Sequence, residues 1–97
     1  MIAREQVLDS LRSFKEEAGV RFGIESLGIF GSVARGLVAD DSDVDVVVKL
    51  ATPNLFTLSR LRIELEDRIG QHVDLVSYRS RMNSFLKERI DQEACYV

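Results

Sequence analysis

The segment from Asp43 to Leu50, DVDVVVKL, constrains the fold more than any other part of the chain. Valine is a strong strand former, and a nearly continuous run of valines is typical of a strand that is buried on both faces. Such a strand needs neighbouring strands beside it and further structure over both faces of the sheet. The segment therefore predicts a small β-sheet flanked by helices.

Periodic apolar residues predict where those helices lie. Apolar side chains spaced three and four residues apart predict a helix near the N-terminus that Gly19 can end. The same spacing predicts a long helix that begins at Thr52-Pro53 and ends at Gly70, and its leucine stripe is interpreted as core. A last helix over residues 82–90 precedes an apolar C-terminal tail that can dock on the rest of the protein.

Two further strands are expected beside the valine-rich one. Ile24–Phe30 is short, apolar and closed by Gly31, and His72–Ser77 is a less regular run with one acid inside it. Between the first two strands, Gly31-Ser32 is expected to form a tight turn and residues 33–37 a brief helical turn before an acidic loop. The expected fold class is α+β, a small mixed β-sheet of about three strands flanked by helices.

Composition limits the class of protein. With 97 residues, 45% of them hydrophobic, and one proline, the chain is expected to form a single domain over residues 1–97 whose modest core favours an obligate partner. The formal net charge of −3 argues against an extended nucleic-acid surface. Cys95 is the only cysteine, which excludes an internal disulfide and a cysteine-based zinc site. Because no segment resembles a signal peptide or reaches membrane-spanning length, a soluble cytoplasmic protein is expected.

Acidic residues mark the candidate site. Asp43 and Asp45 stand at positions i and i+2 of a predicted strand, so their carboxylates share a face, with Cα atoms about 6.5 to 7 Å apart. Asp74 can supply a third carboxylate if its strand lies beside theirs. Carboxylate oxygens are ligands that Mg²⁺ prefers, so these three residues are predicted to hold magnesium. The alternative for each is a solvent-facing acid at a strand end, which is favoured for Asp40 and Asp41 in their turn-like run.

The Gly31-Ser32 turn offers the complementary half of a nucleotide site. Glycine lets backbone N–H groups approach a phosphate closely, and the serine hydroxyl and a following helix N-terminus donate to phosphate oxygens. Arg35 can neutralise a phosphate. The alternatives are that Ser32 is an N-cap of the following turn and that Arg35 is merely solvated.

Other polar residues have less specific interpretations. His72, the sole histidine, is interpreted as a surface or strand-end residue rather than a ligand or a base. Tyr78, Arg79 and Arg81 directly follow the third predicted strand. They can stack on a base and pair with phosphates, or they can form a polar loop.

The motifs GSVARG, SDVDVVV and HVDLV resemble those of the nucleotidyltransferase superfamily of DNA polymerase beta in its smallest form. The pattern Gly-Ser, ten residues, Asp-x-Asp is similar to that of the minimal nucleotidyltransferases that accompany HEPN-domain ribonuclease toxins. The tail from Glu93 to Val97 also resembles endings in that group, so the resemblance covers nearly the whole chain.

The resemblance implies a mixed sheet flanked by helices, with Gly31 and Ser32 holding the triphosphate and Asp43, Asp45 and Asp74 binding magnesium. It implies transfer of AMP from ATP to a hydroxyl of a partner protein, a tyrosine of a co-encoded HEPN toxin, and hence an antitoxin in a hetero-oligomer. No added domain of the kind with which larger relatives bind tRNA, DNA or antibiotics is expected in these 97 residues, so those substrates are disfavoured.

Two hypotheses of function follow. In the first, the protein is an enzyme: Asp43 and Asp45 hold both ions, Asp74 holds one and helps to activate the acceptor hydroxyl, and Gly31, Ser32 and Arg35 bind the nucleotide. In the alternative, it is a non-catalytic antitoxin that neutralises a toxin by direct binding. A transferase directed at RNA or DNA is disfavoured by the acidic composition.

Overall fold

The computed structural model of the protein describes residues 3–36 and 43–97. In these residues the elements run in the order α1 (Arg4–Phe22), β1 (Ile24–Phe30), α2 (Gly31–Ala34), β2 (Val44–Leu50), α3 (Leu55–Ile69), β3 (Val73–Ser77), α4 (Ser84–Glu93) and β4 (Cys95–Tyr96). Of the helices in this part of the chain, none combines the length and the apolar character needed to cross a bilayer.

The strands form one mixed sheet in the order β3-β2-β1-β4. β1 is antiparallel to both β2 and β4, whereas β2 and β3 are parallel. The predicted α+β class is therefore confirmed, with one strand more than the three expected. The additional strand, β4, comes from the apolar tail, which docks as predicted: Cys95 and Tyr96 pair with β1, and the N–H of Val97 donates to the carbonyl of Leu27 at 2.9 Å.

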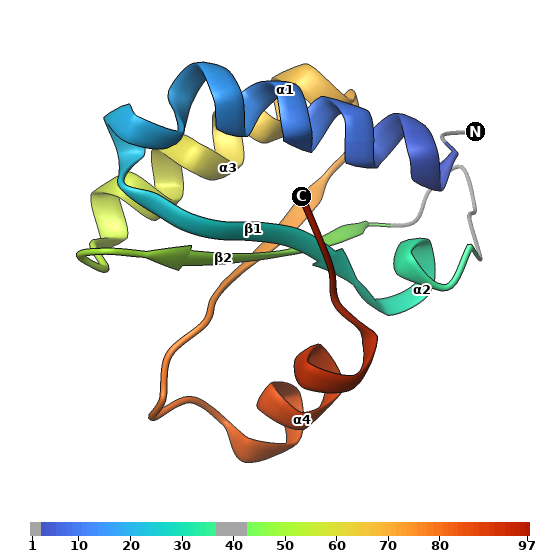
Figure 1. Cartoon of the computed structure of the whole chain (residues 1–97), viewed down its shortest axis with the longest axis vertical. Coiled ribbons are helices and arrows are strands. Elements are labelled where there is room, and N and C mark those ends of the chain that lie inside the picture. Colours follow the sequence, from blue (N-terminus) through green and yellow to red (C-terminus); the bar gives the residue numbers. More distant parts are fainter. Residues whose placement is uncertain (1–2, 37–42) are drawn as a thin grey trace.

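The helices cover both faces of the sheet, as the valine-rich strand requires. Figure 1 shows α1 and α3 together on one face and α4 on the other. The buried residues between the sheet and α1 and α3 form the larger cluster, which includes Leu11, Phe14, Leu27, Ile29, Val44, Val46, Val48, Leu61 and Leu65. On the α4 face, a small cluster contains Phe30, Val47 and Ile90.

Glycines end both long helices, although not both at the predicted position. α1 does not end at Gly19, which is buried within the helix, but continues to Phe22 and ends at Gly23. Gly23 adopts φ 68°, a left-handed conformation that glycine reaches without a steric cost, and its N–H donates to the carbonyls of Gly19 and Val20. α3 ends at Gly70, as predicted, also with positive φ.

The start of α3 is set by a cap that the sequence interpretation missed. The side-chain oxygen of Asn54 accepts hydrogen bonds from the N–H groups of Phe56 and Thr57, at 2.8 and 3.3 Å, so the helix begins at Leu55 and not at Thr52-Pro53. The leucine stripe is core only from its middle onward. Leu55, in the first turn, is 81% exposed.

The segments around the candidate site differ from their predicted bounds by small shifts. α2 begins at Gly31 itself, and β2 begins one residue after Asp43. β3 begins at Val73, directly after His72. The predicted acidic loop, including Asp40 and Asp41, and Leu37 at the end of the predicted helical turn lie outside the described residues.

Candidate active site

The central feature of the site is the pairing of two acids across adjacent strands. Asp45 of β2 and Asp74 of β3 are register partners in the parallel pair. Paired residues on neighbouring strands project from the same face of a sheet. That face carries α4, because Val44 and Val46, on either side of Asp45, belong to the core under α1 and α3. The adjacency on which the predicted acid triad depended is therefore present.

The third acid, Asp43, directly precedes β2. It is exposed, as is Asp74, whereas Asp45 is half-buried. Asp45 is therefore the member of the set whose carboxylate is most strongly affected by its surroundings.

The electrostatics of Asp45 confirm that charged groups converge on it. Burial raises the pKa of the Asp45 carboxyl, and the nearby Asp74 carboxylate raises it further. Arg89 acts in the opposite direction, Asp43 raises the pKa again, and Arg35 lowers it. The carboxylates repel one another here, and a bound cation would relieve that repulsion.

The glycine of the Gly-Ser turn lies directly against this acid. Phe30, the last residue of β1, pairs with Asp45, which brings the following residue over the carboxylate. A Cβ atom on Gly31 would overlap Oδ2 of Asp45, and Gly31 also adopts φ 74°. Both the space and the backbone conformation therefore require glycine at position 31.

Ser32 follows inside α2 and is half-buried. The N-cap position of α2 is occupied by Phe30, which makes no side-chain cap hydrogen bond. The interpretation of Ser32 as an N-cap is therefore wrong. Its position one residue after the contact between Gly31 and Asp45 brings the predicted phosphate turn and the predicted acids into one place.

Two residues of α4 that the sequence did not single out complete the cluster. Nη1 of Arg35 donates to Oε1 of Glu93 at 2.8 Å, and the N–H of Gly31 donates to Oε2 of Glu93 at 3.2 Å. Nη2 of Arg89 lies 3.9 Å from the same Oε2. The i, i+4 spacing of Arg89 and Glu93 is a detectable signal of a helical ion pair, but it does not indicate what that pair faces.

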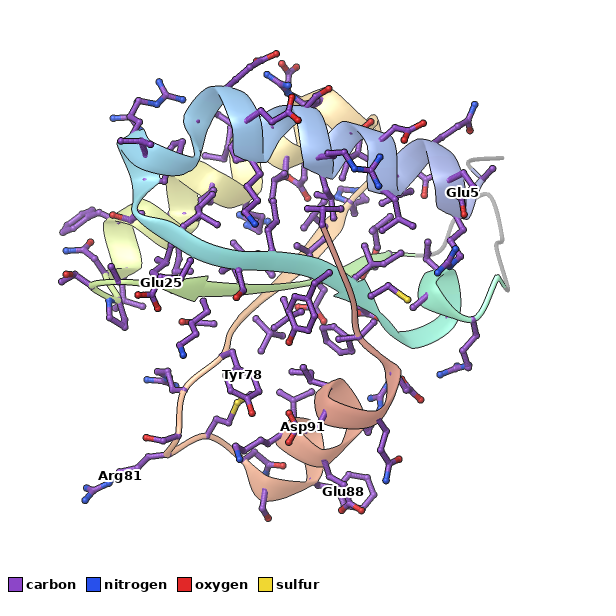
Figure 2. The ribbon with its side chains drawn as sticks, in the orientation of Figure 1. Glu5, Glu25, Tyr78, Arg81, Glu88 and Asp91 are labelled. Atoms are coloured by element: carbon purple, nitrogen blue, oxygen red, sulfur yellow. The ribbon has the colours of Figure 1, made fainter. Side chains whose placement is uncertain are left out.

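Two of the remaining predicted polar residues pair with side chains other than those of Asp43, Asp45 and Asp74. The hydroxyl of Tyr78 donates to Oδ1 of Asp91 at 2.8 Å and so ties the chain after β3 to α4 (Figure 2). Arg81 projects outward from the tip of that connection (Figure 2). His72 is at the surface, as interpreted, with Nδ1 3.4 Å from Oε2 of Glu66.

The donor set fits magnesium. Within residues 3–36 and 43–97, no group of three or more His, Cys, Asp or Glu side chains is close enough to hold a metal ion by itself. Mg²⁺ is usually bound through one or two carboxylates together with water and substrate phosphates, so it does not require such a cage. The carboxylates of Asp45 and Asp74 offer hard oxygen donors at a point where negative charges repel each other.

A groove of about 470 Å³ lies farther along β3. It runs between the first turn of α3, the residues from Leu75 to Ser77, and the start of α4. Leu55 and Met82 contribute to its apolar lining. Leu75, which directly follows Asp74, lines this groove. The acids and the Gly-Ser turn do not line it.

Comparison with known families and proteins gives a consistent result. The family model described as polymerase beta, nucleotidyltransferase matches residues 13–96. The chain is 36% identical over 98 residues to the protein adenylyltransferase MntA of Thermococcus cleftensis, with 100% of this chain and 98% of that protein covered.

Solved structures show the same fold. One that is provisionally described as a minimal nucleotidyltransferase superposes with a TM-score of 0.81 at 32% identity, covering 97% of this chain and 95% of the other. A second is the MNT antitoxin in complex with the tri-AMPylated HEPN toxin of Shewanella oneidensis. It has a TM-score of 0.58 at 20% identity and covers 88% of this chain and 70% of the other, a likeness in fold alone.

Proposed function

This chain belongs to the polymerase beta nucleotidyltransferase family, and on that premise we propose that it transfers AMP from ATP to a hydroxyl group of a partner protein. The acceptor oxygen forms a bond to the α-phosphorus as the bond to the β-phosphate breaks, and pyrophosphate leaves. The partner is a co-encoded HEPN-type toxin, the acceptor is a tyrosine of that toxin, and the transfer makes this protein an antitoxin. ATP is the nucleotide substrate and Mg²⁺ the cofactor.

One observation carries the proposal: the in-register pair of Asp45 and Asp74 lies on the sheet face where Gly31 contacts Asp45. Nucleotidyl transfer needs positive charge at the phosphates and close approach of backbone donors to them. Acids that can hold a cation, set against a glycine turn that can accept a phosphate, meet both needs. An acidic cluster without the turn would be a weaker argument.

Each residue has a distinct role in the proposed reaction. Asp43, Asp45 and Asp74 hold magnesium, which neutralises charge on the phosphates when bound, and Asp74 also helps to orient the acceptor hydroxyl. The turn at Gly31, whose N–H donates to Glu93, seats the phosphates, and the hydroxyl of Ser32 and the guanidinium of Arg35 bind them. The protein thus accelerates transfer mainly by positioning the reactants and balancing charge.

Two comparisons support a protein acceptor. The relative with 36% identity is named a protein adenylyltransferase, and a structure with the same fold pairs an MNT antitoxin with a HEPN toxin that carries AMP groups. The first supports a protein as the acceptor, and the second supports a toxin as that protein and a hetero-oligomer as the working form. The cytoplasm is the proposed location of this hetero-oligomer.

The proposal is tested with purified protein, ATP, Mg²⁺ and the co-encoded toxin. We expect intact-mass spectrometry to show the toxin gaining one or more AMP units, and fragmentation to place them on tyrosine. Asp45→Asn should abolish the gain, whereas Asp67→Asn, the same change at an exposed site on α3, should leave it unchanged. A toxin that gains no mass with the wild-type protein would refute the proposal.

The exposed apolar residues favour a second candidate, neutralisation by binding alone. Leu55, Phe56 and Phe85 are 81%, 84% and 75% exposed, and side chains of this kind often mark protein interfaces. The double change Asp43→Ala, Asp45→Ala separates the two functions in cells that express the toxin. Full protection by a folded double variant would support binding, and lost protection would support catalysis.

A further inference from the structure

Glu93 joins the C-terminal helix to the phosphate turn, 62 residues earlier in the chain. Its Oε2 accepts the N–H of Gly31 at 3.2 Å and its Oε1 accepts Nη1 of Arg35 at 2.8 Å. The Glu93 side chain is 25% exposed, while Arg35 and Arg89 are 47% and 45% exposed. The carboxylate is thus enclosed while the two guanidinium groups remain accessible.

The arrangement is specific because both oxygens of Glu93 accept a hydrogen bond. Oε1 accepts from Arg35 and Oε2 accepts from the Gly31 amide, while Arg89 forms a longer ion pair with Oε2. Charge-assisted hydrogen bonds of this kind are shorter and stronger than neutral ones. Glu93 therefore sets the position of a backbone amide and a cation at once, both at the turn that meets Asp45.

Arg89 adds a second cation beside the acids. Its guanidinium carbon lies 5.9 Å from the centroid of the Phe30 ring, next to the strand end that pairs with Asp45. Two arginines placed this close repel each other, and the carboxylate of Glu93 offsets that repulsion. Without Glu93, Arg35 has no other ion pair among the described residues to hold it at the turn.

We propose that Glu93 is a positioning residue of the nucleotide site, which holds Arg35 and the Gly31 turn in the orientation that receives the phosphates of ATP. The inference rests on the proposed function. A guanidinium carries five N–H donors, so the single hydrogen bond to Glu93 leaves Arg35 with donors for a phosphate. Glu93 acts through Arg35 and Gly31 and does not itself touch the nucleotide.

Nucleotide affinity tests the proposal without any transfer reaction. Titration calorimetry measures the dissociation constant of the non-hydrolysable analogue AMP-PNP with Mg²⁺. Glu93→Gln keeps the length of the side chain but removes its charge, and we expect the dissociation constant to rise about tenfold. Glu88→Gln, on the same helix and directed away from the sheet (Figure 2), is the matched control and should bind as the wild type does.

Two further measurements distinguish positioning from a general loss of structure. The thermal midpoint of Glu93→Gln, followed by circular dichroism, should stay within a few degrees of the wild-type value. In an Arg35→Ala background, adding Glu93→Gln should weaken binding less than it does alone, because one of the two residues through which it acts is gone. If Glu93→Gln does not fold, Glu93→Asp keeps the charge but shortens the reach, and it too should bind more weakly.

The outcomes are separable. Unchanged affinity of a folded Glu93→Gln variant would overturn the inference alone. Tighter binding would also overturn it, because Glu93 would then be a competitor of the phosphate at the Gly31 amide and not a support for it. A wild-type protein that binds no AMP-PNP would overturn the proposed function together with this inference.

Discussion

The two faces of the sheet differ in what they bury. The face under α1 and α3 is an uninterrupted apolar core, in which Val46 and Leu61 are fully buried. The face under α4 has a small apolar cluster around Val47, and the adjoining part of the same face carries Asp45 and Asp74. The comparison shows how a chain of this size separates tasks: one face stabilises the fold, and the other keeps carboxylates within reach of solvent and ligands.

A substitution at Asp45 is expected to show the largest difference between an effect on activity and an effect on stability. Asp45→Asn should reduce nucleotidyl transfer by about 10³-fold, equivalent to about 4 kcal/mol of transition-state stabilisation, because the site loses the charge that holds the cation. Its stability should be unchanged or slightly higher, since the change removes a half-buried charge that is repelled by Asp74. Steady-state kinetics and urea unfolding measure the two quantities. A marked loss of stability would show that the α4 face also supports the fold.

The opposite result is expected for the larger core. Leu61→Ala should lower the free energy of unfolding by about 3 kcal/mol, because it leaves a cavity beside fully buried neighbours. Ile90→Ala, in the small cluster on the α4 face, should cost less, because the fewer residues around it can collapse. Denaturant unfolding measures both changes, and equal losses would contradict the division between a large and a small core.

Gly31 is expected to contribute both to the stability of the fold and to the position of the Asp45 carboxylate. Gly31→Ala should cost about 1 to 2 kcal/mol for the left-handed backbone alone, and it should also displace the Asp45 carboxylate and reduce transfer. Gly70→Ala is a matched control, because Gly70 has φ 81° and nothing within 4 Å of an added Cβ. The difference between the two variants isolates the contact with Asp45. Identical losses of stability and unaltered transfer would mean that the contact is unimportant.

The smallest effect on stability is expected from the hydrogen bond between Glu66 of α3 and Val73 of β3, the strand at the edge of the sheet. Oε2 of Glu66 accepts the N–H of Val73 at 2.9 Å, and this hydrogen bond is the main reason that the pKa of Glu66 lies below its ordinary value of 4.5. The folded state therefore binds fewer protons than the unfolded state in this range. The stabilisation is complete above the ordinary pKa and is lost as the pH falls through the lowered value.

Glu66→Gln should accordingly lower the thermal midpoint by a few degrees at neutral pH, and the difference should shrink as the pH falls below the ordinary pKa of 4.5 and through the lowered value. Scanning fluorimetry over a series of pH values from neutral to acidic measures the difference. Glu25→Gln, which changes an exposed carboxylate on β1 (Figure 2), is the control. A difference that grows on acidification would contradict the assignment.

Local signals predicted β1, β2 and β3 well because each is a short apolar run closed by a polar or glycine boundary, whereas β4 was predicted only as an apolar tail. β1 was predicted residue for residue as Ile24–Phe30, and β2 within one residue. Glycine was a less dependable marker of helix ends. Gly70 ends α3, whereas Gly19 is buried inside α1, because packing against the core outweighs its low helix propensity.

The candidate site was predictable only where it lies in contiguous motifs. Asp43, Asp45 and the Gly-Ser turn stand within one stretch of sequence, and Asp74 was identified as the lone acid in the next strand. Glu93 and Arg89 come from a helix whose contact with the turn is made only by folding. Gly31 and Glu93 are 62 residues apart in the sequence, and no periodic pattern in a single sequence indicates a contact over that distance.

The position of β3 at the margin of the sheet has a consequence for the kind of acceptor that the site can serve. One of the acids stands on this strand, and among the described residues β2 is the only strand that pairs with it. On the side away from β2, no strand of residues 3–36 and 43–97 has to separate before a bulky, already folded molecule can approach. Such lateral access suits the acceptor proposed above, a hydroxyl displayed on the surface of another macromolecule.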